Sequence, residues 1–266
     1  MSKKEKISGT KEWASHTANC CLGCSSGCRY CFAKYDAVKR WKTVSKASDW
    51  KEEKINWKNA KKKQEKKNGT TMFPTTHDIS PNNLDACVMM LENLLSIGND
   101  VLIVSKPHLE CIKILCDNFA KYKEQILFRF TIGAYDNDTL KFWEPGAPSF
   151  GERYDCLQLA YNKDFRTSVS CEPLLDGECV TLLFDMLSDY VTDSIWIGKM
   201  NKSDKRILDK NDNEIKSRLE DVLKWQTDEM IWKIYDELKG EELVKWKESI
   251  KKVVGLKLAD EKGLDI

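Results

Sequence analysis

The stretch "CCLGCSSGCRYCFAKY", Cys20–Tyr35, places five cysteines within twelve residues and decides how the rest of the chain is interpreted. In a small secreted domain such a cluster would predict disulfides, but here no secretory feature accompanies it. In a reducing compartment a dense cysteine cluster is more typical of metal binding or catalysis. The stretch therefore predicts a metal or catalytic site in a chain that otherwise has an ordinary composition.

The composition is that of a globular protein with one large domain. Hydrophobic residues make up 41% of the 266 residues, charged residues make up 32%, and the net charge is +1. This balanced charge indicates no particular partner. The longest apolar runs, such as 101–104, are too short to span a bilayer, and the N-terminus lacks the apolar core of a signal peptide. We therefore predict a cytoplasmic protein that does not act at a membrane.

The six cysteines outside the cluster lie mostly among apolar neighbours. Cysteine packs like a small hydrophobic residue, so a place in the core is expected for each. They are Cys87, Cys111, Cys116, Cys156, Cys171 and Cys179.

Strand-like and helix-like segments alternate along most of the chain, which is typical of parallel βαβ units. Strands are predicted at 12–18, 70–74, 100–106, 126–132, 166–172 and 194–200. Amphipathic helices are predicted at 82–97, 108–123, 149–162 and 177–189. Six such strands form either an incomplete α/β barrel or an open doubly wound sheet, and the pattern alone does not distinguish the two.

Two further segments are predicted to be helical. The polar segment 49–69 reads as a solvated helix, and its lysines at 58–67 are an alternative nucleic-acid surface. From residue 213 the chain reads as a helix pair that closes the sheet, with Trp225, Trp232 and Trp246 facing inward. We expect a domain at 1–212 and a helical extension at 213–266 packed on it.

The cysteine spacings decide which metal group fits. A zinc ribbon separates its two pairs by a long loop, whereas only three residues separate Cys24 from Cys28. A ferredoxin-type run has a different order of gaps and a proline after its last cysteine, where this chain has Phe32. Cys24, Cys28 and Cys31 remain, and three thiolates on one loop can hold three irons of a [4Fe–4S] cluster. The fourth iron is left open, as catalytic metal sites require.

This spacing, with an aromatic residue after the third cysteine, resembles the radical S-adenosylmethionine (SAM) superfamily. The segments "GCRYCFAKY", "VSKP" (104–107), 130–160 and "TSVSCEPLLD" (167–176) further resemble its spore photoproduct lyase-related branch. The resemblance runs from about Asn19 to Asn201. It implies an α/β fold, a partial (β/α)6 barrel, with a [4Fe–4S] cluster and SAM at the carboxyl ends of the strands.

The resemblance also implies the chemistry. SAM chelates the open iron, an electron from the cluster cleaves it, and the resulting 5′-deoxyadenosyl radical abstracts hydrogen from a substrate. An electron donor such as flavodoxin or ferredoxin is implied as a partner. The alternative is a non-catalytic metal–thiolate module, with zinc or iron–sulfur, that binds nucleic acid through 58–67.

The resemblance and the strand ends together name candidate cofactor-binding residues. Phe32 would lie beside the SAM adenine. The segment 75–81 replaces the Gly-Gly-Glu segment that is frequent in the superfamily, so Thr76, His77 or Asp78 would contact the SAM amine. Lys106, at the end of the third strand, would pair with the SAM carboxylate.

Further candidates lie at the ends of the later strands. Thr131 would contact the methionine or ribose part of SAM, and Ser170 would line the pocket. The catalytic residue is unknown, with Cys171 and Glu172 as weak candidates and Trp196 and Asn201 as weaker ones. Glu144 and Arg153 are expected to form a structural pair.

The substrate is not indicated, and nucleic acid is one candidate. In the true lyases a cysteine near the end of the second strand returns a hydrogen atom to the substrate radical. Here that place falls within 73–78, at Thr75, and the segment contains no cysteine. The Thr75 hydroxyl cannot replace a thiol as hydrogen-atom donor to a carbon radical, because an O–H bond is much stronger than an S–H bond. We therefore predict a member of the group that acts on a substrate other than spore photoproduct.

Overall fold

The fold is built on one parallel sheet of seven strands. The computed structural model describes residues 7–264, and the strand order is β1-β4-β5-β6-β7-β8-β9, every neighbouring pair being parallel. The strands are β1 (His16–Thr17), β4 (Thr71–Phe73), β5 (Val101–Ser105), β6 (Ile126–Thr131), β7 (Arg166–Cys171), β8 (Ile195–Ile197) and β9 (Val244–Trp246). The six predicted strands are confirmed, although each is shorter than predicted.

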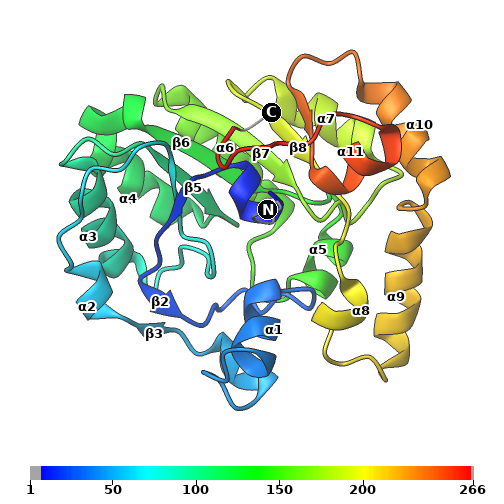
Figure 1. The fold of residues 1–266 in the computed structure, drawn as a ribbon, viewed down its shortest axis with the longest axis horizontal. Helices are drawn as coiled ribbons and strands as arrows, with labels where there is room; N and C mark the ends of the chain where they lie inside the picture. Colours follow the sequence, from blue (N-terminus) through cyan, green and yellow to red (C-terminus); the bar gives the residue numbers. More distant parts are fainter. Residues whose placement is uncertain (1–6, 265–266) are drawn as a thin grey trace, which may run out of the picture.

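The four predicted helices are also confirmed, as α3 (Leu84–Leu95), α4 (Leu109–Phe119), α6 (Phe150–Asn162) and α7 (Val180–Ser188). Each connects two neighbouring parallel strands, and such crossovers share one hand. They therefore lie on the same face of the sheet (Figure 1). β1 and β9 remain the two edges of the sheet, so the sheet does not close into a barrel.

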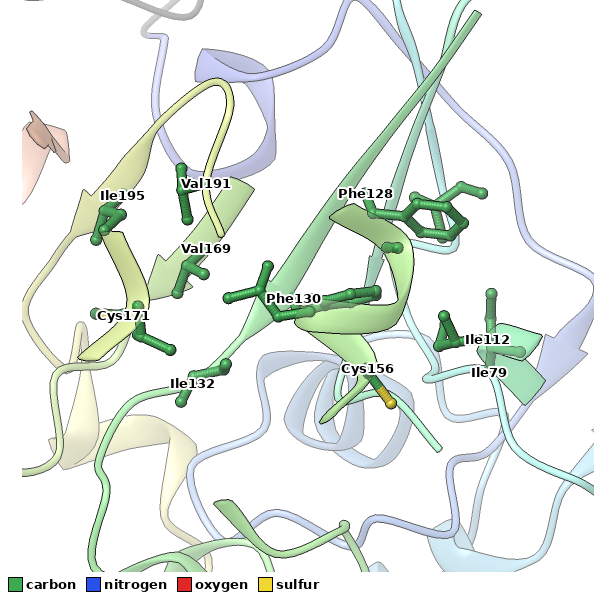
Figure 2. Close-up of a cluster of buried hydrophobic side chains, with 14 of the residues drawn as sticks. Ile79, Ile112, Phe128, Phe130, Ile132, Cys156, Val169, Cys171, Val191 and Ile195 are labelled. Carbon is green, nitrogen blue, oxygen red and sulfur yellow. The ribbon is translucent and has the colours of Figure 1, made fainter. Parts of the chain in front are cut away.

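The main hydrophobic core lies between the sheet and these helices. Alternate strand residues such as Phe128, Phe130 and Val169 point into it, where they meet apolar helix residues such as Ile112 (Figure 2). Of the six scattered cysteines, five are buried as expected, but Cys179 is half-buried. Among the described residues, no helix is both long enough and apolar enough to cross a membrane.

The opposite, concave face of the sheet is covered by the N-terminal segment. A short 3-10 helix, η1 (Gly9–Glu12), leads to Trp13, whose ring meets the ring of Trp196 edge-on with centroids 5.8 Å apart. Arg129, from the middle of β6, lies over the Trp13 ring at 4.8 Å from its centroid. The concave side is therefore filled at this level and is not an open channel.

The prediction of a solvated helix at 49–69 is wrong. The segment contains the 3-10 helix η2 (Ala47–Lys51), the short strand β3 (Lys54–Ile55) and the one-turn helix α2 (Trp57–Ala60), followed by irregular chain. β3 pairs antiparallel with β2 (Cys21–Leu22). Trp50 is buried, so this segment folds inward to hold the start of the cysteine stretch.

The C-terminal region is more than the helix pair that was predicted. It contains α9 (Asn213–Lys224) and α10 (Asp228–Leu238), but also β9 and α11 (Glu248–Val254). Trp246 is buried on β9 as the seventh strand of the sheet, whereas Trp232 is 44% exposed, contrary to prediction. The remaining helices are α1 (Phe32–Lys39), α5 (Asn137–Trp143) and α8 (Ser203–Arg206), and η3 (Ala120–Gln125) follows α4.

Candidate functional site

The cysteine stretch forms a loop at the carboxyl ends of the strands. It follows β1 and leads into α1, and its side chains meet residues that directly follow β4 and β5. Cys24 Sγ lies 3.5 Å from Asp78 Oδ2, and Ser26 Oγ donates to the same oxygen at 2.7 Å. Asp78 follows β4 and Lys106 follows β5, so the loop lies where parallel α/β folds place their chemistry.

Glycines let the backbone of the loop pack tightly. Gly23 has φ +97°, a conformation that other residues rarely adopt, and a Cβ there would lie 2.1 Å from the carbonyl oxygen of Glu52. From the other side, Gly146 approaches so closely that a Cβ would lie 2.1 Å from the carbonyl oxygen of Ser25. The loop is therefore held between the β3 segment and the turn that follows α5.

Hydrogen bonds to Glu53 fix the same loop. Its carboxylate accepts from the backbone N–H and the hydroxyl of Ser25, at 2.9 and 2.8 Å. The other carboxylate oxygen accepts from Ser80 Oγ at 2.6 Å. Sequence reasoning missed Glu53, because it lies in the segment that was predicted to be a solvated helix.

Cys24 and Cys28 are buried and Cys31 is half-buried. Burial, reinforced by the negative charge of Asp78, raises the pKa of Cys24 well above its usual value. Burial also raises the pKa of Cys28 to about 12, against the opposing effect of the Lys106 ammonium. These thiols therefore keep their protons unless a cation displaces them, as metal binding does.

The three cysteines fit an iron–sulfur cluster by their chemistry. Among the described residues, no three His, Cys, Asp or Glu side chains converge on one point where a single ion would lie. In a [4Fe–4S] cluster each thiolate binds a different iron, so the three sulfurs stand further apart than the ligands of one ion. The agreement with a [4Fe–4S] cluster rests on three thiols carried by one loop whose tight packing requires glycines.

Cys20 and Cys21 have other partners. Cys20 Sγ lies 3.6 Å from Cys87 Sγ, beneath helix α3, and its backbone N–H donates to His77 Nε2 at 3.3 Å. The hydrogen bond from Cys87 lowers the pKa of Cys20 to about 6, although burial opposes it. Cys21 Sγ lies 3.6 Å from the carbonyl oxygen of Leu22. Both thiols are already engaged outside the group of three.

Asp78 and Lys106, both predicted cofactor-binding residues, lie together. The Lys106 backbone N–H donates to Asp78 Oδ1 at 2.9 Å, and its ammonium lies 3.6 Å from Asp78 Oδ2. Burial alone would raise the pKa of Asp78, but Lys106 and the surrounding hydrogen bonds outweigh it and lower that pKa. The same pair keeps Lys106 charged beside Cys28, with its pKa raised despite burial.

Thr76 is held by a residue that sequence reasoning missed. Asn19 Oδ1 accepts from the backbone N–H groups of Thr75 and Thr76 at 2.8 and 2.9 Å, and from Thr76 Oγ1 at 3.0 Å. Asn19 Nδ2 donates to Thr75 Oγ1 at 2.6 Å. One asparagine thus fixes the chain after β4, and no local pattern signals this role.

Tyr30, within the loop, begins a buried chain of polar contacts. Its hydroxyl donates to Glu144, and Glu144 forms an ion pair with Arg153 at 2.6 Å in which both side chains are fully buried. Arg153 also donates to the backbone oxygen of Thr131 at 3.1 Å. The expected Glu144–Arg153 pair is present, and it connects the cysteine loop to β6 and α6.

Phe32, at the start of α1, is half-buried beneath a cation. The guanidinium of Arg206, from α8, lies 5.7 Å from the centroid of the Phe32 ring. Burial lowers the pKa of Arg206, although the carboxylate of Glu172 opposes the effect. Arg206 was not predicted, because α8 is a single turn in a charged segment.

The candidates at the ends of β6 and β7 lie on different faces of the sheet. Thr131 and Ser170 are neighbours in register, and the alternation of β7 puts Ser170 on the concave face with Ser168. Cys171 instead lies in the core between sheet and helices (Figure 2). Packing accounts for Cys171, and the face it occupies is opposite to the site.

Glu172 belongs to a buried charge network on the concave side. Lys247 Nζ, from the residue after β9, lies 3.4 Å from Glu172 and 3.1 Å from Glu12. Asn201 Nδ2 donates to Glu172 at 3.3 Å. The weaker candidate Trp196 is fully buried, with the Lys247 ammonium 5.4 Å from the centroid of its ring. Glu12 and Lys247 were missed, because each comes from an end of the chain.

The lysine-rich segment 58–67 begins in α2, directly after the β3 strand that pairs with Cys21–Leu22, and runs away from the cysteine loop. Lys66 Nζ donates to the backbone oxygen of Gly98, and the Lys67 N–H donates to Asn99 Oδ1 at 2.8 Å. Both acceptors precede β5, at the amino ends of the strands. The end of the segment, at Lys66 and Lys67, therefore lies at the opposite end of the sheet from the cysteine loop.

Solved structures with a similar fold include radical SAM enzymes. Spore photoproduct lyase with dinucleoside spore photoproduct matches with a TM-score of 0.55 and 14% identity, over 88% of this chain and 76% of the lyase. A lyase double mutant with bound AdoMet and dinucleoside spore photoproduct matches with a TM-score of 0.56 and 13% identity, over the same shares. Streptococcus suis SuiB bound to S-adenosylmethionine matches with a TM-score of 0.55 and 11% identity, over 92% of this chain and 53% of SuiB.

No protein-family model and no curated protein matches the sequence. The resemblance to the spore photoproduct lyase branch is confirmed by the structural neighbours at the level of the fold.

Proposed function

We propose that this chain is a radical SAM enzyme in which Cys24, Cys28 and Cys31 hold a [4Fe–4S] cluster. The observation that carries the proposal is the position of these thiols, on one loop at the carboxyl ends of a parallel sheet. The sheet resembles that of proteins solved with AdoMet or S-adenosylmethionine bound. When bound, the cluster supplies the electron that cleaves SAM to a 5′-deoxyadenosyl radical, which abstracts hydrogen from the substrate.

The residues around the loop have separate tasks in this proposal. Lys106 binds the SAM carboxylate, since its ammonium is buried beside the loop and held charged by Asp78. Asp78 itself accepts hydrogen bonds from protein partners, so we assign it to positioning Lys106 and the loop. Thr76 contributes to the SAM amine site, and Phe32 packs against the adenine.

The concave face supplies the rest of the pocket. Thr131 and Ser170 line its wall, and Glu172 lies at its floor, where Lys247 neutralises it. The tight packing of Trp13 against Trp196 excludes water from below. The substrate therefore enters from the side of the cysteine loop, and an electron donor such as flavodoxin or ferredoxin also docks there.

Spore photoproduct is not the substrate in this proposal. Thr75, at the place of the lyase cysteine, is bonded to Asn19, and Cys171 faces the core. Nucleic acid remains one candidate substrate. The alternative of a non-catalytic module binding nucleic acid through 58–67 is not favoured, because Lys66 and Lys67 bond to Gly98 and Asn99 at the other end of the sheet from the cysteine loop.

Anaerobic reconstitution tests the proposal. Protein supplied with iron and sulfide should turn brown, and with dithionite it should release 5′-deoxyadenosine from SAM. A colourless protein that retains zinc through reconstitution would contradict it. With dinucleoside spore photoproduct, clean conversion to thymines would contradict the substrate assignment, and loss of that conversion in Cys171→Ala would identify a relocated hydrogen donor.

A further inference from the structure

Arg206 holds a half-buried charge next to the site that the proposed function does not use. It ends α8, the single turn that follows β8 and contacts α1. Its guanidinium lies over the ring of Phe32, the residue directly after Cys31. A molecule bound to this guanidinium would therefore touch the cofactor region.

The guanidinium has no acceptor among the residues that the structure describes. The guanidinium lies over the Phe32 ring, which satisfies none of its five N–H donors. The nearby carboxylates are engaged elsewhere: Glu172 with Lys247 and Asn201, and Asp36 with Arg40 at 3.0 Å. Because the guanidinium is half-buried and these residues offer it no acceptor, a bound molecule can supply one.

SAM does not account for the missing acceptor. Its only anionic group is one carboxylate, and the proposed function assigns that group to Lys106. Lys106 acts on the Cys28 side of the loop beside Asp78, whereas Arg206 lies on the Cys31 side over Phe32. SAM therefore supplies an anionic group for Lys106 and none for Arg206.

Building on the proposed function, we propose that Arg206 binds an anionic group of the substrate, a phosphate or a carboxylate, beside the cofactor. The planar guanidinium can bind either group through two parallel hydrogen bonds. The Phe32 ring beside the guanidinium restricts its position before the substrate arrives. Arg206 is then a specificity-determining residue, and neutral molecules of the same shape are rejected.

Phenylglyoxal, which modifies free arginine side chains, tests this in the purified full chain without cluster or SAM. Peptide mapping by mass spectrometry should show Arg206 modified and the buried, paired Arg153 unmodified. Inorganic phosphate, succinate and a short oligothymidylate are the competitors, against sodium chloride at equal ionic strength. Protection by phosphate and oligothymidylate assigns a phosphate group, and protection by succinate alone assigns a carboxylate; either result supports the proposal.

Absence of protection by all three competitors would overturn it. So would protection of Arg206 by SAM alone in the reconstituted enzyme, because the guanidinium would then serve the cofactor. Because the competition uses protein without cluster, a failed reconstitution would refute the proposed function and leave this result unaffected.

A matched pair of variants gives a second measurement. Phosphorus NMR line broadening of inorganic phosphate should show about tenfold weaker binding in Arg206→Gln, as the loss of a charge-assisted hydrogen bond implies. Lys205→Gln, which removes an exposed charge from the same turn, should bind phosphate like the parent. Equal binding in Arg206→Gln and Lys205→Gln would refute the role.

Discussion

Gly146 has no side chain, and the carbonyl oxygen of Ser25 occupies the place where one would lie. A Cβ would meet that oxygen at 2.1 Å, and backbone cannot yield as a flexible side chain can. We expect Gly146→Ala to lower the free energy of unfolding by about 1–3 kcal/mol and to reduce iron retention. Urea unfolding and iron analysis measure the two effects.

Gly240→Ala is the matched control for this change, because nothing lies within 4 Å of a Cβ at that position. It should retain the iron content of the parent. If Gly146→Ala also binds iron like the parent, the close approach of that turn does not shape the loop.

The three loop cysteines should each be required for the cluster. Cys24→Ala, Cys28→Ala and Cys31→Ala should lose most of the iron after reconstitution, because each removes one of three thiolates. Cys21→Ala should keep most of it, since Cys21 Sγ is engaged with Leu22. Iron and sulfide analysis with visible absorption gives the comparison. Equal loss in Cys21→Ala and Cys28→Ala would favour ligation by four thiolates.

Lys106→Ala should weaken SAM binding more than it lowers the iron content. A shielded charge-assisted hydrogen bond contributes about 1.5–3 kcal/mol, which corresponds to an affinity loss of roughly tenfold or more. Calorimetric titration of the reconstituted variant with SAM measures this loss, and iron analysis of the same sample provides the control. An unchanged SAM affinity would refute the role.

Among single residues, the sequence allowed the prediction of those with a recognisable spacing or a place directly after a strand. The cysteines are recognised by their spacing, and Asp78 and Lys106 by their places after strands. Asn19 and Arg206 were not predictable, because their contacts are set by folding. The bond of Asn19 to Thr75 spans 56 positions, and no local pattern records it.

Between elements, the Glu144–Arg153 pair joins the loop, α5 and α6. Arg153→Met should lower the free energy of unfolding by about 3–5 kcal/mol, because it leaves the buried Glu144 carboxylate without a cation. Urea unfolding of the protein without cluster measures the change. Arg166→Met, which removes a 53% exposed guanidinium paired with Asp193, should cost at most about 1 kcal/mol. Equal costs would show that the buried pair is not a structural link.

Among the elements, long strands and amphipathic helices were predictable, because their periodicity reflects burial on one side. Strand β9 was not predictable from the sequence. It has only three residues, Val244–Trp246, the middle one is a lysine, and charged residues lie on both sides. The structure of the segment 49–69 was mispredicted for a related reason. It is polar enough to look like a solvated helix, yet Trp50 anchors it in the interior and Glu53 bonds the loop.

In the molecule as a whole, Lys247 ties both ends of the chain to the concave face. It neutralises Glu12 and Glu172, and its ammonium lies 3.9 Å from the centroid of the Trp13 ring. Lys247→Met should lower the free energy of unfolding by about 3–5 kcal/mol, because Glu12 is then buried without a cation. Thermal and urea unfolding measure the loss.

Adding Glu12→Gln to Lys247→Met should restore part of that stability, because it removes the uncompensated charge. Lys252→Met is the control, since its exposed ammonium pairs with Glu248 at the surface, and it should change stability by no more than about 0.5 kcal/mol. A double variant less stable than Lys247→Met would contradict the network.

The tie between the chain ends also sets an order for biosynthesis. Lys247 Nζ donates to the backbone oxygen of Gly9, 238 positions earlier, at 2.9 Å. A nascent chain leaves the ribosome from its N-terminus, so the cysteine loop emerges long before the lysine that completes the concave face. A ribosome that stalls before Lys247 would release a chain in which Glu12 and Glu172 repel each other. Only chains that extend through Lys247 therefore complete this charge network on the concave face.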